Sequence, residues 1–126
     1  DAGATVVVSA RTRAQVDEVV AEITSSGGTA LAVTADASIR SEAVRPVEAA
    51  VDAYGRVDVL VNNVGGSVLG DQSPFGGDMD VIESVLTLNL TSAFWITHAA
   101  LPHMRAQQYG RVISIGSGAS RRASAS

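Results

Sequence analysis

Short apolar segments alternate with longer amphipathic ones along this chain. Four segments rich in β-branched residues, at 5–9, 30–35, 57–61 and 111–115, predict strands. The first has apolar residues at successive positions, which is typical of a strand buried on both faces. Between the strands, apolar residues recur at helical spacing. They are Val16, Val19, Val20 and Ile23 in the first helical stretch, and Val44, Val47, Val51 and Tyr54 in the second.

A third helical stretch is expected over 79–108, and local signals mark where the shorter helices begin. Thr12, followed three positions later by a glutamine, predicts a capping box at the first helix. Ser38 is the expected N-cap before the second helix. Pro46 lies inside that helix and should kink it or delay its start, because proline lacks the backbone N–H.

The order of elements is that of an α/β protein, βαβαβ-loop-αβ, and it predicts a Rossmann-like doubly wound parallel sheet that is incomplete. Helical crossovers join parallel strands and place helices on both faces of one open sheet. Ligands bind such sheets beyond the carboxyl ends of the strands. Polar residues follow the four predicted strands at that edge: Arg11, Asp36, Asn62, Asn63 and Ser117.

Composition narrows the chemistry further. The charged residues, with a net charge of −4, are scattered along the chain and indicate no surface for nucleic acid. No apolar run reaches the length of a membrane span. There is no cysteine, and two histidines are too few for a metal site of their own. All nine basic residues are arginine. We expect a cytoplasmic protein, and the arginine-only, alanine-rich composition suggests a GC-rich bacterial gene.

Three ordered blocks resemble the short-chain dehydrogenase/reductase family. Residues 58–65 read D-V-L-V-N-N-V-G and are similar to the family's D-x-L-V-N-N-A-G block. Residues 88–90 read L-N-L and resemble its N-L motif. Residues 110–117 read G-R-V-I-S-I-G-S and resemble a strand of the 3-oxoacyl-[acyl-carrier-protein] reductase branch. The resemblance covers essentially the whole chain and implies hydride transfer between NADPH and a carbonyl or alcohol.

The resemblance also implies a cofactor site. Arg11 stands where a Rossmann strand ends near the adenosine ribose, and with no acid nearby it can pair with a 2′-phosphate, so the expected cofactor is NADP(H). Asp36 resembles the residue that binds the adenine edge, with the backbone amide of Ala37. An ordinary solvated arginine and a capping aspartate are the competing interpretations.

Nearer the nicotinamide, the resemblance implies that Asn62 and Asn63 brace the sheet edge and the ribose. Gly65 would let the backbone approach the cofactor. Ser117 is the expected catalytic hydroxyl on the substrate carbonyl, and Asn89 would bend its helix and hold a water for proton relay. No metal is expected in the reaction.

Two family motifs have no match in this sequence. The phosphate loop, T-G-x-x-x-G-x-G, would precede Asp1, and the Y-x-x-x-K motif would follow Ser126. The two tyrosines lie upstream of Ser117, and no lysine exists to pair with either. We therefore expect residues 1–126 to be a partial NADP(H)-binding Rossmann domain, an internal fragment that is inactive alone. The parent would be a homo-oligomer joined through its long helices.

Two other classes of protein are compatible with parts of the pattern. The first is a non-catalytic nucleotide-binding or interaction domain of native short length. The second is a flavodoxin-like receiver domain, which also places acids at strand ends. The receiver is disfavoured because no acidic pair follows a first strand and no lysine completes such a site.

Overall fold

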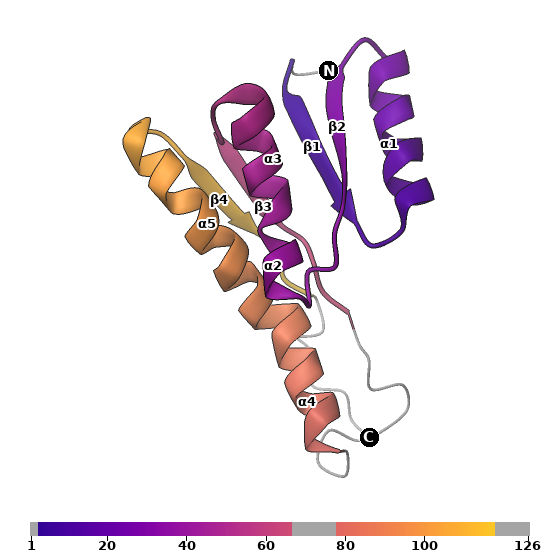
Figure 1. Ribbon diagram of the computed structural model, residues 1–126, viewed down its shortest axis with the longest axis vertical. Helices are drawn as coiled ribbons and strands as arrows, with labels where there is room; N and C mark the ends of the chain where they lie inside the picture. The colour runs from indigo at the N-terminus through magenta and orange to yellow at the C-terminus, as the bar shows by residue number, and fades with distance from the viewer. Residues whose placement is uncertain (1–2, 67–77, 118–126) are drawn as a thin grey trace.

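The computed structural model describes residues 3–66 and 78–117, which form parallel strands flanked by helices (Figure 1). The chain begins with strand β1, helix α1 and strand β2, and continues through two helices, α2 and α3, into strand β3. Helices α4 and α5 follow, joined by the π-helix η1, and strand β4 comes last. The bounds are β1 Thr5–Ala10, α1 Arg13–Ser25, β2 Thr29–Thr34, α2 Arg40–Ala43, α3 Arg45–Tyr54, β3 Val59–Asn62, α4 Met79–Leu86, η1 Thr87–Thr91, α5 Ser92–Ala106 and β4 Arg111–Ser114.

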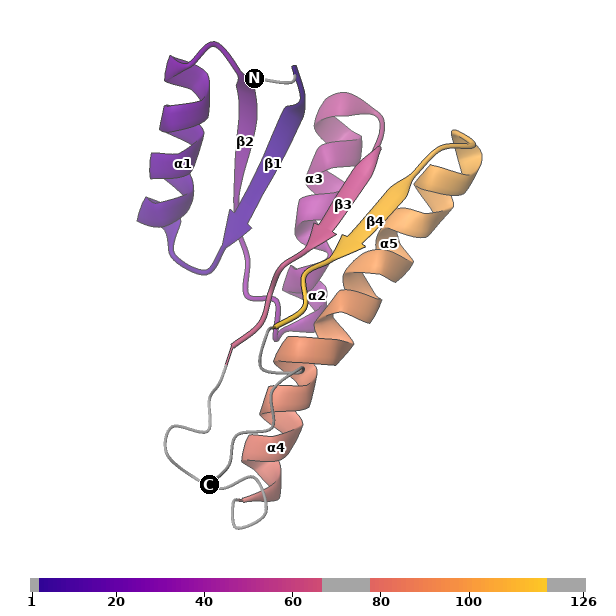
Figure 2. The ribbon, with the colours of Figure 1, turned by 180° about the vertical axis from the view of Figure 1, so that it is seen from behind.

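The strands form two parallel ladders. β1 pairs with β2 from Thr5↔Thr29 to Ala10↔Thr34, and β3 pairs with β4 from Val59↔Arg111 to Asn62↔Ser114. No ladder joins β1 to β3 within the described residues. Figure 2 shows β1 and β3 as neighbours with their arrowheads pointing the same way. The described strands thus form two pairs in place of one continuous ladder, and their directions and crossovers are those of the predicted incomplete α/β fold.

The main hydrophobic core lies between the long helix and its neighbours. Ala100 of α5 is fully buried, and Met104 one turn later is 6% exposed. Leu60 of β3 and Trp95 of α5 pack against this core. Its buried members are Ala43, Val47, Val57, Ile96, Ala100 and Met104. Helices α2 and α3 thus meet α5 through small and β-branched side chains.

The opposite sides of the strands are more open than their sequence suggests. Val59 and Val61 of β3 are 50% and 53% exposed, and Ile113 of β4 is 46% exposed. In β1, Val6 is 36% exposed. The prediction that β1 is buried on both faces is wrong here, because no described element covers its second edge or all of its surface.

Helix boundaries confirm some local signals and correct others. Pro46 stands at the first turn of α3, after a break that follows Ala43, so the delayed start is confirmed. Gly55 ends α3 with φ 73°, a left-handed conformation that glycine adopts without a Cβ clash. Thr12 occupies the N-cap of α1, but its side chain makes no capping bond. The N-cap of α2 is Ile39, because the Ser38 hydroxyl is bonded to Asp36 instead.

The third helical stretch is continuous, but it is not α-helical throughout. Five residues between α4 and α5 form the π-helix η1, with Asn89 at their centre. The Ser92 hydroxyl, 1% exposed as a residue, donates to the carbonyl of Leu88 at 2.7 Å. A π segment inserts one residue into the helical ladder and is frequent at functional sites.

Candidate functional site

All four strands end at the same side of the molecule, and the predicted site residues follow those ends (Figures 1 and 2). Arg11 follows β1, Asp36 follows β2 and Asn62 ends β3. The described contacts bring these residues together in two groups. One group lies at the tips of β1 and β2, and the other lies where β3 approaches the long helix.

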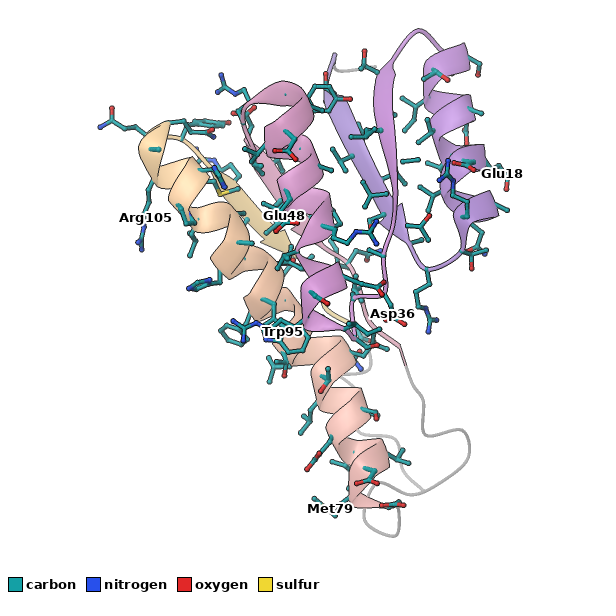
Figure 3. The ribbon with its side chains drawn as sticks, in the orientation of Figure 1. Glu18, Asp36, Glu48, Met79, Trp95 and Arg105 are labelled. Atoms are coloured by element: carbon teal, nitrogen blue, oxygen red, sulfur yellow. The ribbon has the colours of Figure 1, made fainter. Side chains whose placement is uncertain are left out.

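Asp36 organises the first group (Figure 3). Its Oδ1 accepts from the backbone N–H of Ser38 at 2.9 Å and from the Ser38 hydroxyl at 2.6 Å. These bonds stabilise the carboxylate and lower the pKa of Asp36, and attraction to Arg11 adds to the effect. The backbone N–H of Asp36 donates to Glu42 Oε2 at 2.8 Å. The turn after β2 is thus fixed with an ionised carboxylate at its surface.

Arg11 is the exposed cation of the same group. It forms no ion pair with the described residues, and its electrostatic partner is Asp36. Arg13 differs, because its guanidinium lies 2.7 Å from Asp17, which raises the pKa of Arg13. Of the two arginines that follow β1, Arg11 is therefore the one whose guanidinium remains available to an anion.

Asn62 belongs to the second group and is 8% exposed. Its Nδ2 donates to Thr97 Oγ1 on α5 at 3.1 Å. Its Oδ1 is buried without a hydrogen-bond partner among the described residues. A buried acceptor without a donor is costly, so this oxygen marks a place where a donor is needed.

Asn89 joins the π-helix to the loop after β3. Its Oδ1 accepts from the backbone N–H of Gly66 at 2.9 Å, and its Nδ2 donates to the Gly66 carbonyl at 2.8 Å and to the Val85 carbonyl at 2.9 Å. A Cβ on Gly65 would lie 2.9 Å from Asn89 Oδ1, closer than packed atoms tolerate. We call the three hydrogen bonds of the Asn89 side chain the Asn89 clip. Gly65 leaves the space that this clip needs, a role that the sequence alone did not suggest.

The remaining predicted residues lie on the surface of the same region. Asn63 is exposed directly after β3, and Ala37 is half-buried in the turn beside Asp36. Ser117 is exposed three residues beyond β4, at the end of the second described range. The roles of these three residues stay predictions.

Three participants were not anticipated. Thr97 holds Asn62, Glu42 holds the turn at Asp36, and Gly66 receives Asn89. Thr97 and Gly66 lie 35 and 23 positions from their partners, so no local spacing indicates them. Glu42 could have been found, because an acid six positions after Asp36 lies in the first turn of the short helix that follows.

Two kinds of feature are missing from the described ranges. His, Asp and Glu side chains do not come together there in threes that could hold a metal ion. None of the helices in those ranges has both the length and the apolar character required to cross a bilayer.

Comparison with known proteins gives consistent matches. A family model described as short chain dehydrogenase matches residues 1–126. The chain is 37% identical to a 3-oxoacyl-[acyl-carrier-protein] reductase of Synechocystis sp. over 116 residues, covering 91% of this chain and 46% of the reductase. It is 35% identical to a 7alpha-hydroxysteroid dehydrogenase of Clostridium sardiniense, covering 90% of this chain and 44% of that enzyme. The chain therefore spans less than half of either relative's length.

Solved structures agree with these matches. A metagenomic short-chain oxidoreductase in complex with NADP superimposes with a TM-score of 0.87 at 30% identity, covering 96% of this chain and 54% of that one.

Proposed function

The chain belongs to the short-chain dehydrogenase/reductase family, and from that premise we propose that it is part of an NADP(H)-binding Rossmann domain. The whole protein would transfer hydride between NADPH and a carbonyl or alcohol substrate. The observation that carries this proposal is the placement of Arg11, Asp36, Asn62 and the Asn89 clip at the shared carboxyl end of parallel strands.

The cofactor's adenosine end would lie against the tips of β1 and β2. Arg11 would pair with the 2′-phosphate, since its guanidinium forms no ion pair among the described residues. Asp36 would accept from the adenine amino group, and the Ala37 amide would donate to the ring. The fixed turn supports this role, because Oδ1 of Asp36 is engaged by Ser38 and no described group takes Oδ2.

The bound ligands of similar solved structures support a nicotinamide cofactor for this chain. One similar structure is complexed with NADP, and a 7 alpha-hydroxysteroid dehydrogenase structure with a TM-score of 0.88 is complexed with NADH. Arg11 is the feature of this chain that favours NADP(H) between the two. When bound, the cofactor supplies the hydride.

Asn89 would serve the reaction by positioning. Both atoms of its amide are directed at Gly66 and Val85, so its side chain holds the loop beside the π-helix. Asn62 and Asn63 would brace the ribose side of that loop. Ser117 would donate its hydroxyl to the substrate carbonyl and stabilise the developing alkoxide.

Residues 1–126 by themselves would not catalyse the reaction. Proton transfer in this family is assigned to a tyrosine paired with a lysine, and this sequence has no lysine. The whole protein would be a homo-oligomer joined through the long helix. Leu86, Leu90 and Phe94 support this, because they are 51%, 53% and 67% exposed at four-residue spacing along one side.

The decisive experiment is a fluorescence titration of NADPH with residues 1–126 and, in parallel, with the complete product of the encoding gene. We expect weak or no binding by the short chain and saturable binding, with carbonyl reduction, by the complete product. Tight binding by the short chain without any activity of the complete product would instead favour a non-catalytic nucleotide-binding domain.

A further inference from the structure

Strand β2 has an edge that pairs with no described strand. The Ala35 N–H donates to the Ala10 carbonyl at 3.1 Å, so the backbone groups of odd-numbered residues around β2 face β1. Because successive residues of a strand direct their backbone groups to opposite sides, those of Ala30, Ala32 and Thr34 point outward. No described strand pairs with them.

The edge also lacks the usual protection against pairing. Exposed edge strands commonly carry lysine, proline, an inward-pointing charge or a bulge. The six residues of β2 are Thr-Ala-Leu-Ala-Val-Thr, and their ladder with β1 is regular over its whole length. A second strand could therefore approach the edge without meeting a long or charged side chain of β2 itself.

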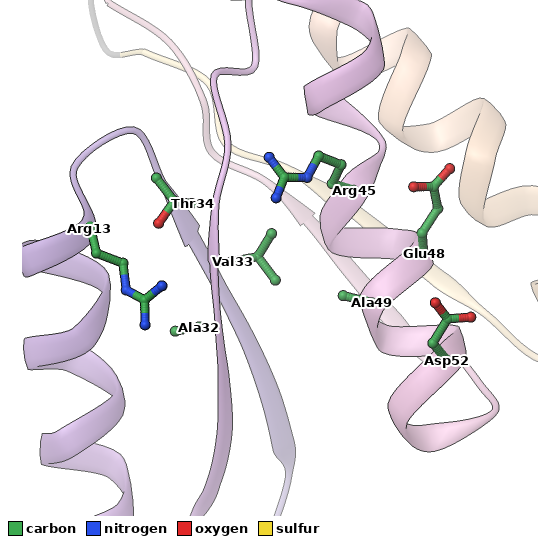
Figure 4. A pocket seen from close by; sticks show the side chains of 8 residues that line it. All are labelled: Arg13, Ala32, Val33, Thr34, Arg45, Glu48, Ala49 and Asp52. Carbon is green, nitrogen blue, oxygen red and sulfur yellow. The ribbon is translucent and has the colours of Figure 1, made fainter.

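The groove along this edge carries charge of both signs in a definite order (Figure 4). Arg45, at the start of α3, lies beside the carboxyl end of β2, and Asp52 lies two turns further along the same helix, with Glu48 between them. Thr34 Oγ1, in the same groove, is buried without a partner among the described residues. Arg13, on the α1 side, is already paired with Asp17.

A twofold axis through Ala32 uses this order of charges. It would pair β2 with β2 of a second copy in antiparallel fashion, with Ala30 opposite Thr34. The two α3 helices would run antiparallel, so Arg45 of each copy would face Asp52 of the other. An isologous contact of this kind makes each favourable pair twice. Glu48 would lie nearest the axis, where the Glu48 carboxylates of the two copies would face each other. This repulsion is the one unfavourable contact in the arrangement.

We propose that the free edge of β2 pairs antiparallel with β2 of a second copy of this chain, extending the sheet across a twofold axis near Ala32. The long-helix contact suggested above uses a different surface. The proposal does not depend on cofactor binding or catalysis, so its failure would leave the proposed function untouched.

Single cysteines test the geometry, because the chain has none of its own. Directly opposite residues of an antiparallel pair have Cα atoms about 4.5–5.5 Å apart, within disulfide reach. In a Phe94→Glu background, chosen to prevent association through the long helix, Ala32→Cys should form a disulfide-linked dimer under mild oxidation. Ala21→Cys, exposed on α1, is the matched control and should remain monomeric. Equal cross-linking of both variants would overturn the proposal.

Charge exchange tests the same contact without a covalent cross-link. In the same background, sedimentation equilibrium should show that Asp52→Arg weakens the dimer about tenfold, since two attractive pairs become repulsive. Combining it with Arg45→Asp should restore the dimer, whereas Glu83→Arg on α4 should change nothing. Glu48→Gln should strengthen it. A monomer at all concentrations, or a dimer insensitive to every one of these changes, would contradict the proposal.

Discussion

The two ladders of this molecule support the candidate site in different ways. At β1 and β2 the site residues are charged, lie near the surface and interact mainly within one turn, as Asp36 does with Ser38. Around β3 and the π-helix, two amides connect segments far apart in sequence, as Asn62 does with Thr97 and Asn89 does with Gly66. The first arrangement is suited to selecting a ligand by charge, and the second to holding a shape. Substitutions in the first region should therefore change ligand selectivity, and substitutions in the second should change stability.

The largest effect is expected in the packed region around α5. Met104→Ala should lower the free energy of unfolding by about 3 kcal/mol, because the side chain is 6% exposed within the main core. Met79→Ala is a matched control, since Met79 is 63% exposed and should change stability by less than about 0.5 kcal/mol. Urea denaturation followed by circular dichroism measures both. Equal losses for the two methionines would contradict the assignment of the core.

The clip between the π-helix and the loop should come next. Asn89→Ala removes three hydrogen bonds and should cost about 2 kcal/mol. Hydrogen exchange should show faster exchange of the Gly66 amide, with β1 and β2 unaffected. Asn63→Ala, on the exposed neighbour of Asn62, provides the control. An unchanged Gly66 amide in the Asn89 variant would mean that the clip does not persist in solution.

Charge reversal at the other ladder should alter selectivity instead of stability. In the complete gene product, Arg11→Asp should shift the preference between NADPH and NADH by about tenfold or more toward NADH, which corresponds to about 1.4 kcal/mol. Arg13→Asp should have a smaller effect, because Arg13 is already bonded to Asp17. The ratio of kcat/KM for the two cofactors measures the change. A ratio unaffected by Arg11→Asp would refute the NADP(H) assignment.

The smallest effect concerns the turn at Asp36. Its pKa is lowered in the folded chain, so its contribution to stability is complete above the ordinary aspartate pKa of about 4 and is lost as the pH falls through the lower folded-state value. Ser38→Ala removes the hydroxyl bond, the largest cause of the shift, and keeps the backbone N–H bond, so the pKa of Asp36 should rise part of the way toward its ordinary value. Carboxyl NMR titration of the parent chain and the variant measures this. A pKa unchanged by the substitution would place its origin elsewhere.

The sequence predicted the elements well because their signals are local. The apolar runs and helical spacing located every described strand, and Pro46 marked the start of α3. The strand ends also placed Arg11 beside Asp36. Capping was predicted less well, because Ser38 had two possible partners and its hydroxyl bonds Asp36.

What the sequence could not predict depends on distant segments. Whether β1 and β3 share a ladder depends on what lies between them, and neither strand's own residues decide it. The π-helix is equally invisible in the apolar pattern, which runs unbroken from α4 into α5. The clip at Gly66 required both the π-helix and the loop to be in place before it could be recognised.

The missing ladder between β1 and β3 has a thermodynamic consequence. One half of the chain holds α1 with β1 and β2, and the other holds α5 with β3 and β4. Without backbone hydrogen bonds between β1 and β3, the two halves are joined largely by α3, which packs on β1 and β2 on one side and on α5 on the other. Melting of residues 1–126 should then be broad, with the half containing α1 loosening before the half containing α5, in place of a single sharp calorimetric transition.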